Sequence, residues 1–376
     1  MKVVGVICEY NPFHNGHAYQ LKQAKTLSHA DFTVCVMSGA FVQRGEPAVL
    51  DKWTRAEMAL RNGADVVLEL PALFAVRSAQ DFAFGGVSLL DSLNVVTHLS
   101  FGAETDDLQA LLSLTEPESP EISAKIKEGL SHGLSYPAVL QSALGRELLP
   151  NDILAVEYLR SLKKLNSPME PIPVHRVDPH NGAASSTAIR KAILSGADFA
   201  ENVPENTLSL LKDNLPTKIP TLDGFSQAIL YLLRTTPPEA LAARFAIPEG
   251  LENRLCREAF SVSTVSALVE AVKSRRYSEA RIRRLLVQIL LGFDKRLIFA
   301  HPAPEYARVL GFKTSAAPLL KEMQEKSSVP ILLKTADAPK TTLLQCDFTA
   351  QNVWDLLSGL PAHRDFTEKI RVIKDI

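Results

Sequence analysis

The sequence has few cysteines, and they stand far apart. Its 376 residues include only four, Cys8, Cys35, Cys256 and Cys346, with no Cys-x-x-Cys pair and no cluster of cysteine with histidine. A structural zinc ion needs ligands at such spacings, and a disulfide framework needs a denser set of cysteines. We therefore expect no structural zinc and four reduced, mostly buried thiols.

Long apolar runs are also missing. The longest, at residues 285–293, is interrupted by Gln288 and is much shorter than the roughly 18 residues that cross a membrane. The apolar stretch near the N-terminus is interrupted by Glu9 and is too short for a secretory signal. The sequence thus predicts a cytoplasmic protein without a membrane partner, and it indicates no particular oligomeric state.

The chain has almost no net charge, since 41 Lys and Arg stand against 42 Asp and Glu. This excludes a generally basic nucleic-acid binder but not a local basic region. Residues 251–300 carry ten basic and five acidic side chains, and Tyr277 lies among several of the arginines. Such a segment suits RNA phosphates and stacking on an unpaired base, although a solvated helix face has the same composition. Both interpretations stay open from composition alone.

In the first half of the chain, short β-branched segments alternate with helical ones. Strands are predicted at residues 3–8, 32–37, 65–70, 95–101 and 171–177. Nearly continuous apolar strands separated by helices are typical of a parallel sheet covered on both faces, so we expect a Rossmann-like, doubly wound α/β fold. Prolines accumulate after residue 203, and the rest of the chain is predicted to be mainly α-helical. We therefore expect two domains, residues 1–205 and 206–376.

The most specific pattern, His14-x-Gly16-His17, follows the first predicted strand and opens a predicted helix. Amides at a helix N-terminus attract phosphate, and a glycine lets a nucleotide approach the backbone. Two imidazoles can donate hydrogen bonds to an α-phosphate whose charge grows as pyrophosphate leaves. The pattern predicts a nucleotide-activating site; two ordinary loop histidines are the alternative.

Hydroxyl side chains precede a second predicted helix, at residues 185–194. Ser185 and Ser186 open it, and Arg190 follows in its first turns. A serine in this position is commonly just a helix N-cap. Nucleotidylyltransferases with the His-x-Gly-His pattern place a similar turn near the triphosphate, so the segment has both a structural and a functional interpretation.

Six further segments indicate one family among the nucleotidylyltransferases that have the His-x-Gly-His pattern. They are residues 37–47, 51–55, 69–71, 101–104, 151–154 and 275–284. With the His14 pattern they resemble the bacterial tRNA(Met) cytidine acetate ligases, over nearly the whole chain and most densely in residues 1–104. The resemblance implies an enzyme that couples acetate to ATP, giving acetyl-adenylate and pyrophosphate. It then transfers the acetyl group to the wobble cytidine of elongator tRNA(Met), and the product is N4-acetylcytidine.

The resemblance also implies which residues form the site. His14 and His17 would be catalytic. The ATP-binding residues would be Ile7, Cys8, Glu9, Tyr10, Asn11, Pro12, Phe13, Asn15, Gly16, Gln20, Gly102, Asn151, Arg176, Ser185, Ser186 and Arg190. ATP would enter with Mg²⁺, held mainly by the nucleotide and water, because the sequence shows no carboxylate cage; no metal ligand is assigned. One departure from the family pattern is the rewritten loop at residues 177–183.

Acetate is a small anion that needs one or two donors, and the segment after the second strand supplies them. The acetate candidates are Ser38, Gln43, Arg44 and Lys52. Arg44 could instead be a solvated surface charge, and Asp51 is expected to cap the helix at residues 52–61. The tRNA-binding candidates are Arg275, Arg276, Tyr277, Arg281, Arg283 and Arg284.

Two other functions have to be weighed against this one. An adenylyltransferase acting on a phosphorylated small molecule would have almost the same His-x-Gly-His site, although its compact fold would not need so long a helical C-terminal half. A non-catalytic, nucleotide-responsive RNA-binding protein could keep the fold without turnover. Pyrophosphate release that depends on a phosphorylated acceptor and not on tRNA would favour the adenylyltransferase. Exchange of pyrophosphate into ATP that is stimulated by acetate would exclude the non-catalytic protein.

Overall fold

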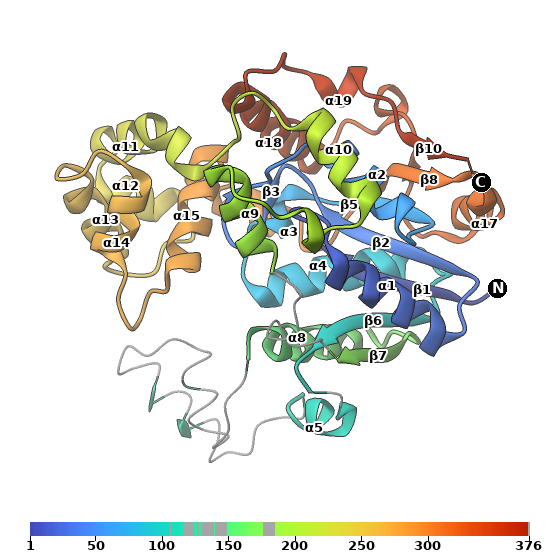
Figure 1. The fold of residues 1–376 in the computed structure, drawn as a ribbon. Helices are drawn as coiled ribbons and strands as arrows, with labels where there is room; N and C mark the ends of the chain where they lie inside the picture. Colours follow the sequence, from blue (N-terminus) through green and yellow to red (C-terminus); the bar gives the residue numbers. More distant parts are fainter. Residues whose placement is uncertain are drawn as a thin grey trace.

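A central sheet organises the protein, of which the computed structural model describes residues 1–105, 107–115, 149–175 and 185–374, with isolated residues 124, 125, 128, 129 and 139 (Figure 1). In this part of the chain the sheet has eight strands, ordered β10-β8-β5-β2-β1-β6-β7, with β9 paired to β8. They are β1 (Val3–Cys8), β2 (Phe32–Ser38), β5 (Val66–Leu70), β6 (His98–Ala103), β7 (Glu170–His175), β8 (Ala307–Lys313), β9 (Ile331–Leu332) and β10 (Arg371–Ile373).

The first five of these strands all run parallel, so their carboxyl ends meet at one edge. From β1 the chain builds the sheet outward through β2 and β5, and then it returns to the other side of β1 with β6 and β7. The order therefore reverses at β1 and β6. Ligands of open α/β sheets bind outside the carboxyl ends of the strands at such a reversal.

Side chains of β1 alternate between two apolar cores, one on each face of the sheet. Val3 and Ile7 enter one core, and Val4 and Val6 enter the other. Helices that contribute to the first core are α3 (Ala72–Ala75), α4 (Ala79–Ser92), α5 (Leu108–Ser113) and α8 (Pro150–Leu165). Those that contribute to the second are α1 (Asn15–Ser28), α2 (Lys52–Arg61), α9 (Ser186–Ser195) and α10 (Glu205–Asn214). The predicted doubly wound fold is confirmed.

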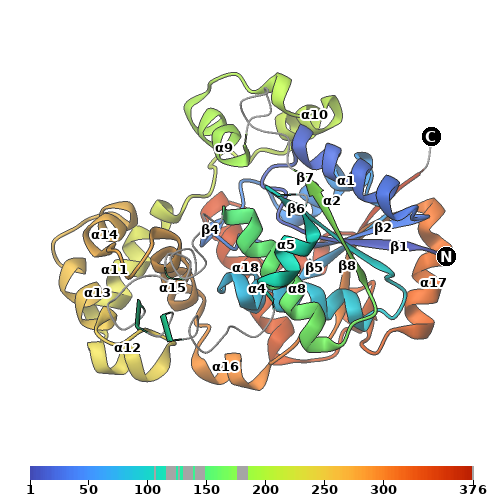
Figure 2. The ribbon, with the colours of Figure 1, turned by 90° about the horizontal axis from the view of Figure 1, so that it is seen from below.

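A helical unit lies at one end of this sheet, shown in yellow and orange in Figures 1 and 2. It contains α11 (Ser226–Thr235), α12 (Pro238–Arg244), α13 (Leu251–Ala259), α14 (Val265–Val272), α15 (Glu279–Leu291) and α16 (Lys295–Ala300). One face of α15 is apolar, since Ile282, Leu285, Leu286 and Ile289 are all buried. The apolar interior of the helical unit is continuous with the first core of the sheet.

The last part of the chain leaves the helical unit and returns to the sheet. β8 pairs antiparallel with β5, and β10 pairs with β8. Helices α17 (Ala317–Lys326), α18 (Thr342–Ser358) and α19 (Arg364–Thr367) accompany these strands. The prediction of one helical domain over residues 206–376 is therefore wrong after α16, because residues from 307 onward complete the sheet of the N-terminal domain. Short β-segments of this kind give little sequence signal of which edge they join.

A buried ionic cluster fastens this returning segment to the sheet. Lys52 Nζ lies 2.7 Å from Glu69 Oε1 and 2.7 Å from Asp365 Oδ1. Arg308 Nη1 lies 3.1 Å from Glu69 Oε2 and 2.6 Å from Asp365 Oδ1. Two cations and two carboxylates alternate, so each buried charge has an opposite neighbour, as burial in a low dielectric requires.

The helical unit contacts the N-terminal domain through α15 and the hairpin of β3 (Phe41–Val42) and β4 (Glu46–Pro47). Gly45 in the hairpin has φ of +76°, and a Cβ there would lie 2.4 Å from the backbone nitrogen of Arg284. Arg284 donates to the carbonyl of Gln43, and Arg283 pairs with Glu46 at 3.2 Å. Glycine is thus needed here for both its conformation and the close approach of the helix.

Two further expectations can be compared with the described residues. All four cysteines are free and buried, as predicted. Within the part of the chain that the structure describes, no helix combines the length and the apolar character needed to span a membrane.

Candidate active site

The connection from β1 to α1 places both predicted catalytic histidines. His14 is the N-cap of α1, and its Nδ1 accepts a hydrogen bond from the backbone N–H of Gly16 at 3.1 Å. His17 Nδ1 accepts from the backbone N–H of His14 at 3.3 Å. The two side chains thus form a reciprocal capping box, a motif usually made by serine or threonine with glutamate.

These cap contacts determine which ring nitrogens can donate. Since Nδ1 of each imidazole accepts from a backbone amide, Nδ1 carries no proton, and the neutral ring must be protonated on Nε2. Both residues line the same cavity. The backbone of the helix start therefore selects, for both rings, the tautomer that offers an N–H donor on the edge away from the helix.

Gly16 and two aromatic rings hold the imidazoles in place. A Cβ on Gly16 would lie 2.9 Å from His14 Cε1, closer than side-chain carbons approach. The rings of Tyr10 and Phe13 are both buried and lie with their centroids 4.8 and 5.5 Å from that of His17. The glycine in the pattern thus makes room for the neighbouring histidine.

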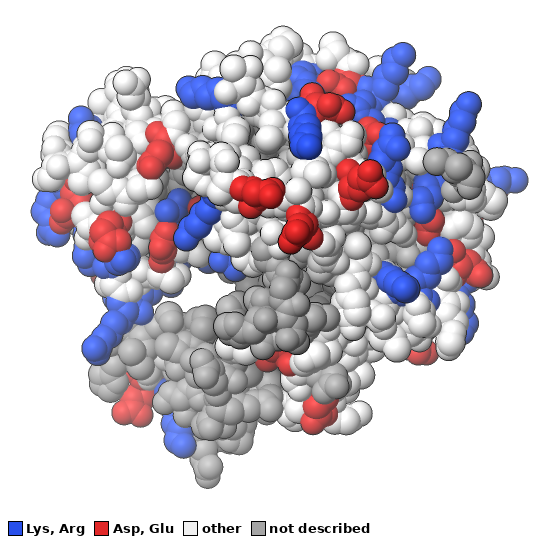
Figure 3. Space-filling model, viewed as in Figure 1, with Lys and Arg blue, Asp and Glu red and all other residues white. Residues whose placement is uncertain are grey.

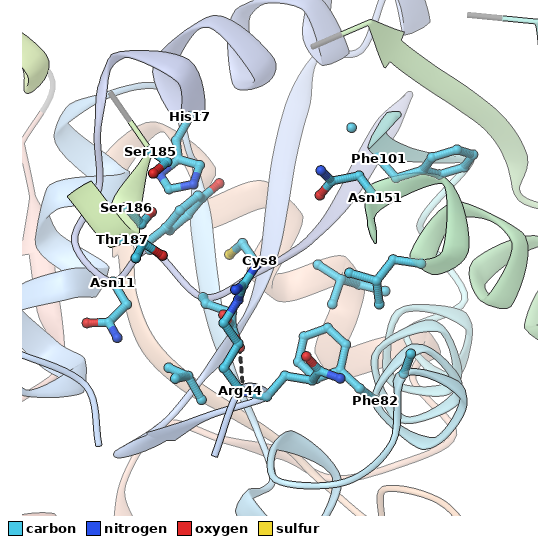
Figure 4. A pocket seen from close by; sticks show the side chains of 18 of the residues that line it. Cys8, Asn11, His17, Arg44, Phe82, Phe101, Asn151, Ser185, Ser186 and Thr187 are labelled. Carbon is cyan, nitrogen blue, oxygen red and sulfur yellow. Dashed lines mark hydrogen bonds between the residues drawn. The ribbon is translucent and has the colours of Figure 1, made fainter. Parts of the chain in front are cut away.

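A cavity of about 510 Å³ opens at the carboxyl ends of β1 and β6, where the strand order reverses. In Figure 4 His17, Ser185 and Ser186 lie on one wall, and Asn151 and Phe101 lie across from them. Most of the predicted nucleotide residues line it, namely Ile7, Cys8, Glu9, Tyr10, Asn11, His14, His17, Gln20, Gly102, Asn151, Ser185, Ser186 and Arg190. Pro12 and Phe13 lie in the β1–α1 connection and Asn15 and Gly16 begin α1, but none of the four lines the cavity.

The N-terminus of α9 faces the same cavity. Ser185 caps the helix by accepting from the backbone N–H of Ala188 at 3.3 Å, which confirms its N-cap role. Ser185, Ser186 and Thr187 all line the cavity, so the capping turn is also part of the site. Exposed amides at a helix start favour an anion such as phosphate.

Arginines give the cavity its charge. Arg44, Arg190 and Arg284 line it, and Glu9 is the one carboxylate among its described lining residues. Arg190 donates to the carbonyl of Asn11 at 3.0 Å and to Thr187 Oγ1 at 3.1 Å, which joins α9 to the β1–α1 connection. Burial raises the pKa of Glu9, although an amide of Gln43 and nearby arginines oppose the shift. The cavity therefore has an excess of positive charge, which suits a polyphosphate.

The opposite wall joins β6 to α8. The Glu104 carboxylate accepts from the Asn151 side chain and from the backbone N–H of Asp152, and Asp152 Oδ1 accepts from the backbone N–H of Glu104 at 2.9 Å. This reciprocal pair fixes the start of α8 beside the end of β6. Asn151 and Gly102 thereby come to line the cavity from elements far apart in sequence.

Sequence reasoning missed several residues that shape the site. Phe82, Phe101 and Tyr158 contribute an apolar wall. Arg55 is fully buried, donates to the carbonyls of Glu9, Ser38, Gly39 and Leu50, and so clamps the ends of β1 and β2. Arg55 stands in a segment that resembles the family, but nothing in its spacing predicts that its partners are backbone carbonyls.

Two of the four acetate candidates lie outside the cavity. Gln43 and Arg44 line it, but Ser38 and Lys52 do not, and both are completely buried. Lys52 belongs to the ionic cluster with Glu69 and Asp365. The acetate role predicted for Ser38 and Lys52 is therefore wrong in this structure, because neither side chain faces the cavity. Asp51 caps α2 through the backbone N–H of Thr54 at 2.8 Å, as expected.

The tRNA candidates divide into exposed and buried residues. Arg275, Arg276 and Arg281 are exposed near the start of α15, where Figure 3 shows basic side chains at the lower end of the helical unit. Tyr277 is only 7% exposed, and its hydroxyl donates to the carbonyl of Glu249. The stacking role predicted for Tyr277 is wrong in this arrangement because its ring belongs to the apolar core.

Arg283 and Arg284 are held by the β3–β4 hairpin of the N-terminal domain. Burial, and then the like charge of Arg281, lower the pKa of Arg284 to about 10. Arg176 and the loop at residues 177–183 lie outside the described residues. In the described part of the chain, no group of three or more His, Cys, Asp or Glu side chains has metal-site geometry.

Comparisons with known proteins agree with this geometry. Residues 1–369 match the family model described as HIGH Nucleotidyl Transferase. The chain is 38% identical over 384 residues to the tRNA(Met) cytidine acetate ligase of Thermoanaerobacter sp. (strain X514), with 95% of each chain covered. It is 36% identical over 417 residues to that of Acetivibrio thermocellus, covering 99% of this chain and 100% of the relative. It is also similar to the crystal structure of Thermotoga maritima TmcAL bound with alpha-thio ATP, with a TM-score of 0.91, 32% identity and full coverage of both chains.

Proposed function

The chain belongs to the tRNA(Met) cytidine acetate ligase family of HIGH nucleotidyl transferases, and from this membership we propose that it activates acetate with ATP and acetylates the wobble cytidine of elongator tRNA(Met). The observation that supports this most directly is the pair of histidines whose cap contacts leave Nε2 as the donor in a positively charged cavity. Because the proposed substrate is a tRNA, we also propose that the protein acts in the cytoplasm.

In the first proposed step, an acetate oxygen attacks the α-phosphorus of ATP. A carboxyl–phosphate bond forms, the bond to the bridging oxygen of the β-phosphate breaks, and pyrophosphate leaves with the bonding electrons. Negative charge grows on the oxygens around the α-phosphorus, and His14 and His17 donate hydrogen bonds to it from Nε2. The start of α9 and Arg190 hold the phosphates.

The adenine and acetate ends of the cavity are assigned by its chemistry. The apolar wall of Phe82, Phe101 and Tyr158 suits a flat base. Gln43 and Arg44 provide the amide and the cation for acetate. Gln43 is held by its backbone N–H, which donates to Glu9 Oε1 at 2.5 Å, so the acetate end is fixed to the end of β1.

Magnesium would bind mainly to the nucleotide and water in this proposal. Glu9 is the one carboxylate among the described residues that line the cavity, which is too few for a protein-made cage. When bound, Mg²⁺ would neutralise part of the negative charge on the phosphates. The protein's own contribution is the donors of the two histidines, the helix start and the arginines.

In the second proposed step, the N4 amine of cytidine attacks the carbonyl carbon of acetyl-adenylate. A nitrogen–carbon bond forms, the carbon–oxygen bond to AMP breaks, AMP leaves with the electron pair, and the amine releases one proton. The amine is a weak nucleophile, which explains the need for an activated acyl group. The wobble base sits in a single-stranded loop, so it is reached without opening a duplex. We propose that Arg275, Arg276 and Arg281 contact the tRNA backbone, and their exposure supports this role.

One experiment tests the whole proposal. The protein is incubated with ATP, Mg²⁺, labelled acetate and transcribed elongator tRNA(Met), and the tRNA is digested to nucleosides. We expect label in N4-acetylcytidine, and no label when ATP is omitted or the wobble cytidine is replaced by uridine. Pyrophosphate release that needs a phosphorylated small molecule and ignores tRNA would favour the adenylyltransferase instead. Complete absence of acetate-dependent pyrophosphate exchange would favour a non-catalytic RNA-binding protein.

A further inference from the structure

A second cavity, of about 620 Å³, lies between the N-terminal domain and the helical unit. Its first wall comes from the start of α4 and from α8, with Gln80, Asp81 and Arg160 among the residues. Its second wall comes from the helical unit, with Ala246, Leu251 and Arg281. Every residue that lines it lies in the described part of the chain.

The second cavity lies next to the first and shares part of its wall. Gln43, Ala79, Ile153, Ser278 and Arg284 line both of them. Arg284 lies at the boundary between the two cavities, because it lines both. An acceptor held in the second cavity would therefore lie beside the place where acetate is activated.

The charge of the second cavity suits a nucleotide of an RNA strand. Five arginines line it, Arg77, Arg160, Arg276, Arg281 and Arg284, against the two carboxylates Asp81 and Glu157. Arg276 and Arg281 are exposed at its edge and can meet phosphates outside. Apolar side chains such as Ile153, Leu251 and Leu285 line it as well, as a flat base requires.

The hydrogen-bonding groups that line the second cavity suit cytosine better than uracil. Cytosine presents an amine donor beside two acceptors, and carboxylates are the usual partners of that amine. Asp81 accepts from Arg77 at 2.7 Å and from Ser78 Oγ at 2.6 Å, which fixes its carboxylate at the start of α4. Glu157 is buried and accepts from Arg160 at 3.0 Å. Uracil would turn a carbonyl oxygen toward these carboxylates.

We infer that the second cavity is the acceptor site, which takes an unstacked cytidine nucleotide of a single-stranded RNA loop and presents its amine to the acyl-adenylate in the first cavity. This inference rests on the proposed function and adds to it where the target base enters. It also assigns Arg284 a positioning role between the two substrates.

Filling the second cavity tests the inference. Ala246→Trp introduces a ring from the helical unit at a residue that lines the second cavity but not the first. Ala243→Trp is the matched control, because Ala243 is exposed on the neighbouring helix α12 and lines neither cavity. Gln80→Trp fills the same space from the opposite wall, so it gives an answer if the first variant does not fold.

Two assays separate the half-reactions, namely acetate-dependent exchange of pyrophosphate into ATP and acetyl transfer to tRNA. We expect Ala246→Trp and Gln80→Trp to keep exchange within about twofold of the unmodified protein and to lower kcat/KM for tRNA by about tenfold or more. Ala243→Trp should change neither. Cytidine monophosphate should compete with tRNA but not with ATP, uridine monophosphate should compete less well, and Ala246→Trp should weaken inhibition by cytidine monophosphate.

Other outcomes overturn the inference. Normal transfer in both filled variants would show that the base enters elsewhere. An equal fall of exchange and transfer in both would assign the second cavity to ATP or acetate. Equal inhibition by the two nucleotides would remove the preference for cytosine. Absence of exchange in the unmodified protein would instead contradict the proposed function.

Discussion

The imidazole rings of His14 and His17 are stacked, with 3.6 Å between their centroids and 25° between their planes. Each ring accepts a backbone amide through Nδ1. The start of α1 and the chemistry of the site are therefore built from the same two side chains. A useful substitution at either position keeps the acceptor that caps α1 through Nδ1 and removes the donor at Nε2.

Asparagine makes that separation for both histidines. Its side-chain oxygen can occupy the place of Nδ1, and asparagine is a favoured N-cap, but it has no group at the position of Nε2. We expect His14→Asn and His17→Asn to lower acetate-dependent pyrophosphate exchange by about 10²–10⁴-fold while the melting temperature changes little. His29→Asn, at the far end of the same helix in a left-handed conformation that asparagine tolerates, is the control. Normal exchange in His17→Asn would remove its catalytic role.

Gly16→Ala should affect activity more than stability. Alanine is a better helix residue than glycine by about 1 kcal/mol, so the helix itself gains. The new Cβ would lie 2.9 Å from His14 Cε1, and the imidazole must turn away. We therefore expect exchange to fall by about tenfold or more with little change in unfolding free energy. A variant with full activity would show that the position of the His14 ring is not critical.

Lys52→Met tests whether Lys52 is structural, as its burial indicates. The change leaves Glu69 and Asp365 with only Arg308 as a buried cation, which should cost about 3–5 kcal/mol in urea unfolding. Lys25→Met is the control, because the Lys25 side chain is 43% exposed and its partner Asp65 also pairs with Lys313, so the loss should cost less than about 1 kcal/mol. The KM for acetate should not change in either variant. A raised KM for acetate in Lys52→Met alone would restore its proposed role in binding.

Asp347 should make stability depend on pH. Burial, and then the charge of Glu69, raise the pKa of Asp347 to about 7 from its ordinary 3.8. The folded protein therefore holds a proton that the unfolded chain releases, so the contribution of this group to stability falls as pH rises from about 4 to 7. Asp347→Asn mimics the protonated form: its Oδ1 can still accept from the backbone N–H of Ala72, and its Nδ2 can donate to the Tyr306 hydroxyl, which donates to the carboxylate in the structure.

The expected measurement is the unfolding free energy of both proteins across this pH range. The difference in favour of Asp347→Asn should grow with pH and level off above pH 7, reaching up to about 4 kcal/mol. Asp213→Asn, at an exposed position, should show no such growth. A constant difference at all pH values would show that Asp347 is ionised throughout.

The exposed arginines should act on tRNA alone. Arg275→Ala combined with Arg276→Ala removes two cations from the surface next to α15, at positions that do not line the ATP cavity. We expect weaker tRNA binding and unchanged pyrophosphate exchange. The slope of log K for tRNA against log salt concentration should become shallower by about 0.7–0.9 for each phosphate that the variant no longer neutralises. Arg257→Ala removes a similarly exposed arginine elsewhere in the helical unit and serves as the control. Equal salt slopes would assign these arginines to a solvated face.

The sequence predicted the local parts of the fold well. The strand at residues 3–8 and the helix that Asp51 caps are found at the expected positions, because their signals, apolar continuity and a capping side chain, are local. The return of β8 and β10 to the sheet was not predicted. β5 and β8 pair across more than two hundred residues. This pairing depends on which edge of the sheet is unpaired and on buried charges such as Arg308. The sequence of β8 alone indicates neither.

The candidate site divides in the same way. His14, Gly16 and His17 were found because one short motif contains both histidines and the turn that orients them. Lys52 was misassigned because its position after a strand suggests a ligand contact, whereas its partner Asp365 lies at the other end of the chain. The second cavity could not be predicted, since its walls come from two separate parts of the fold.

The antiparallel pairing of β5 with β8 also bears on how the protein is made. On the ribosome, β5 emerges some two hundred and forty residues before its partner, as the pairing of Glu69 with Arg308 shows. Until then the edge of β5 in the nascent chain is unpaired. Lys52 and Glu69, which are buried in the folded protein, also lack some of their oppositely charged partners. Chains released early by premature termination would retain that unpaired strand edge, which is a site for aggregation with other chains.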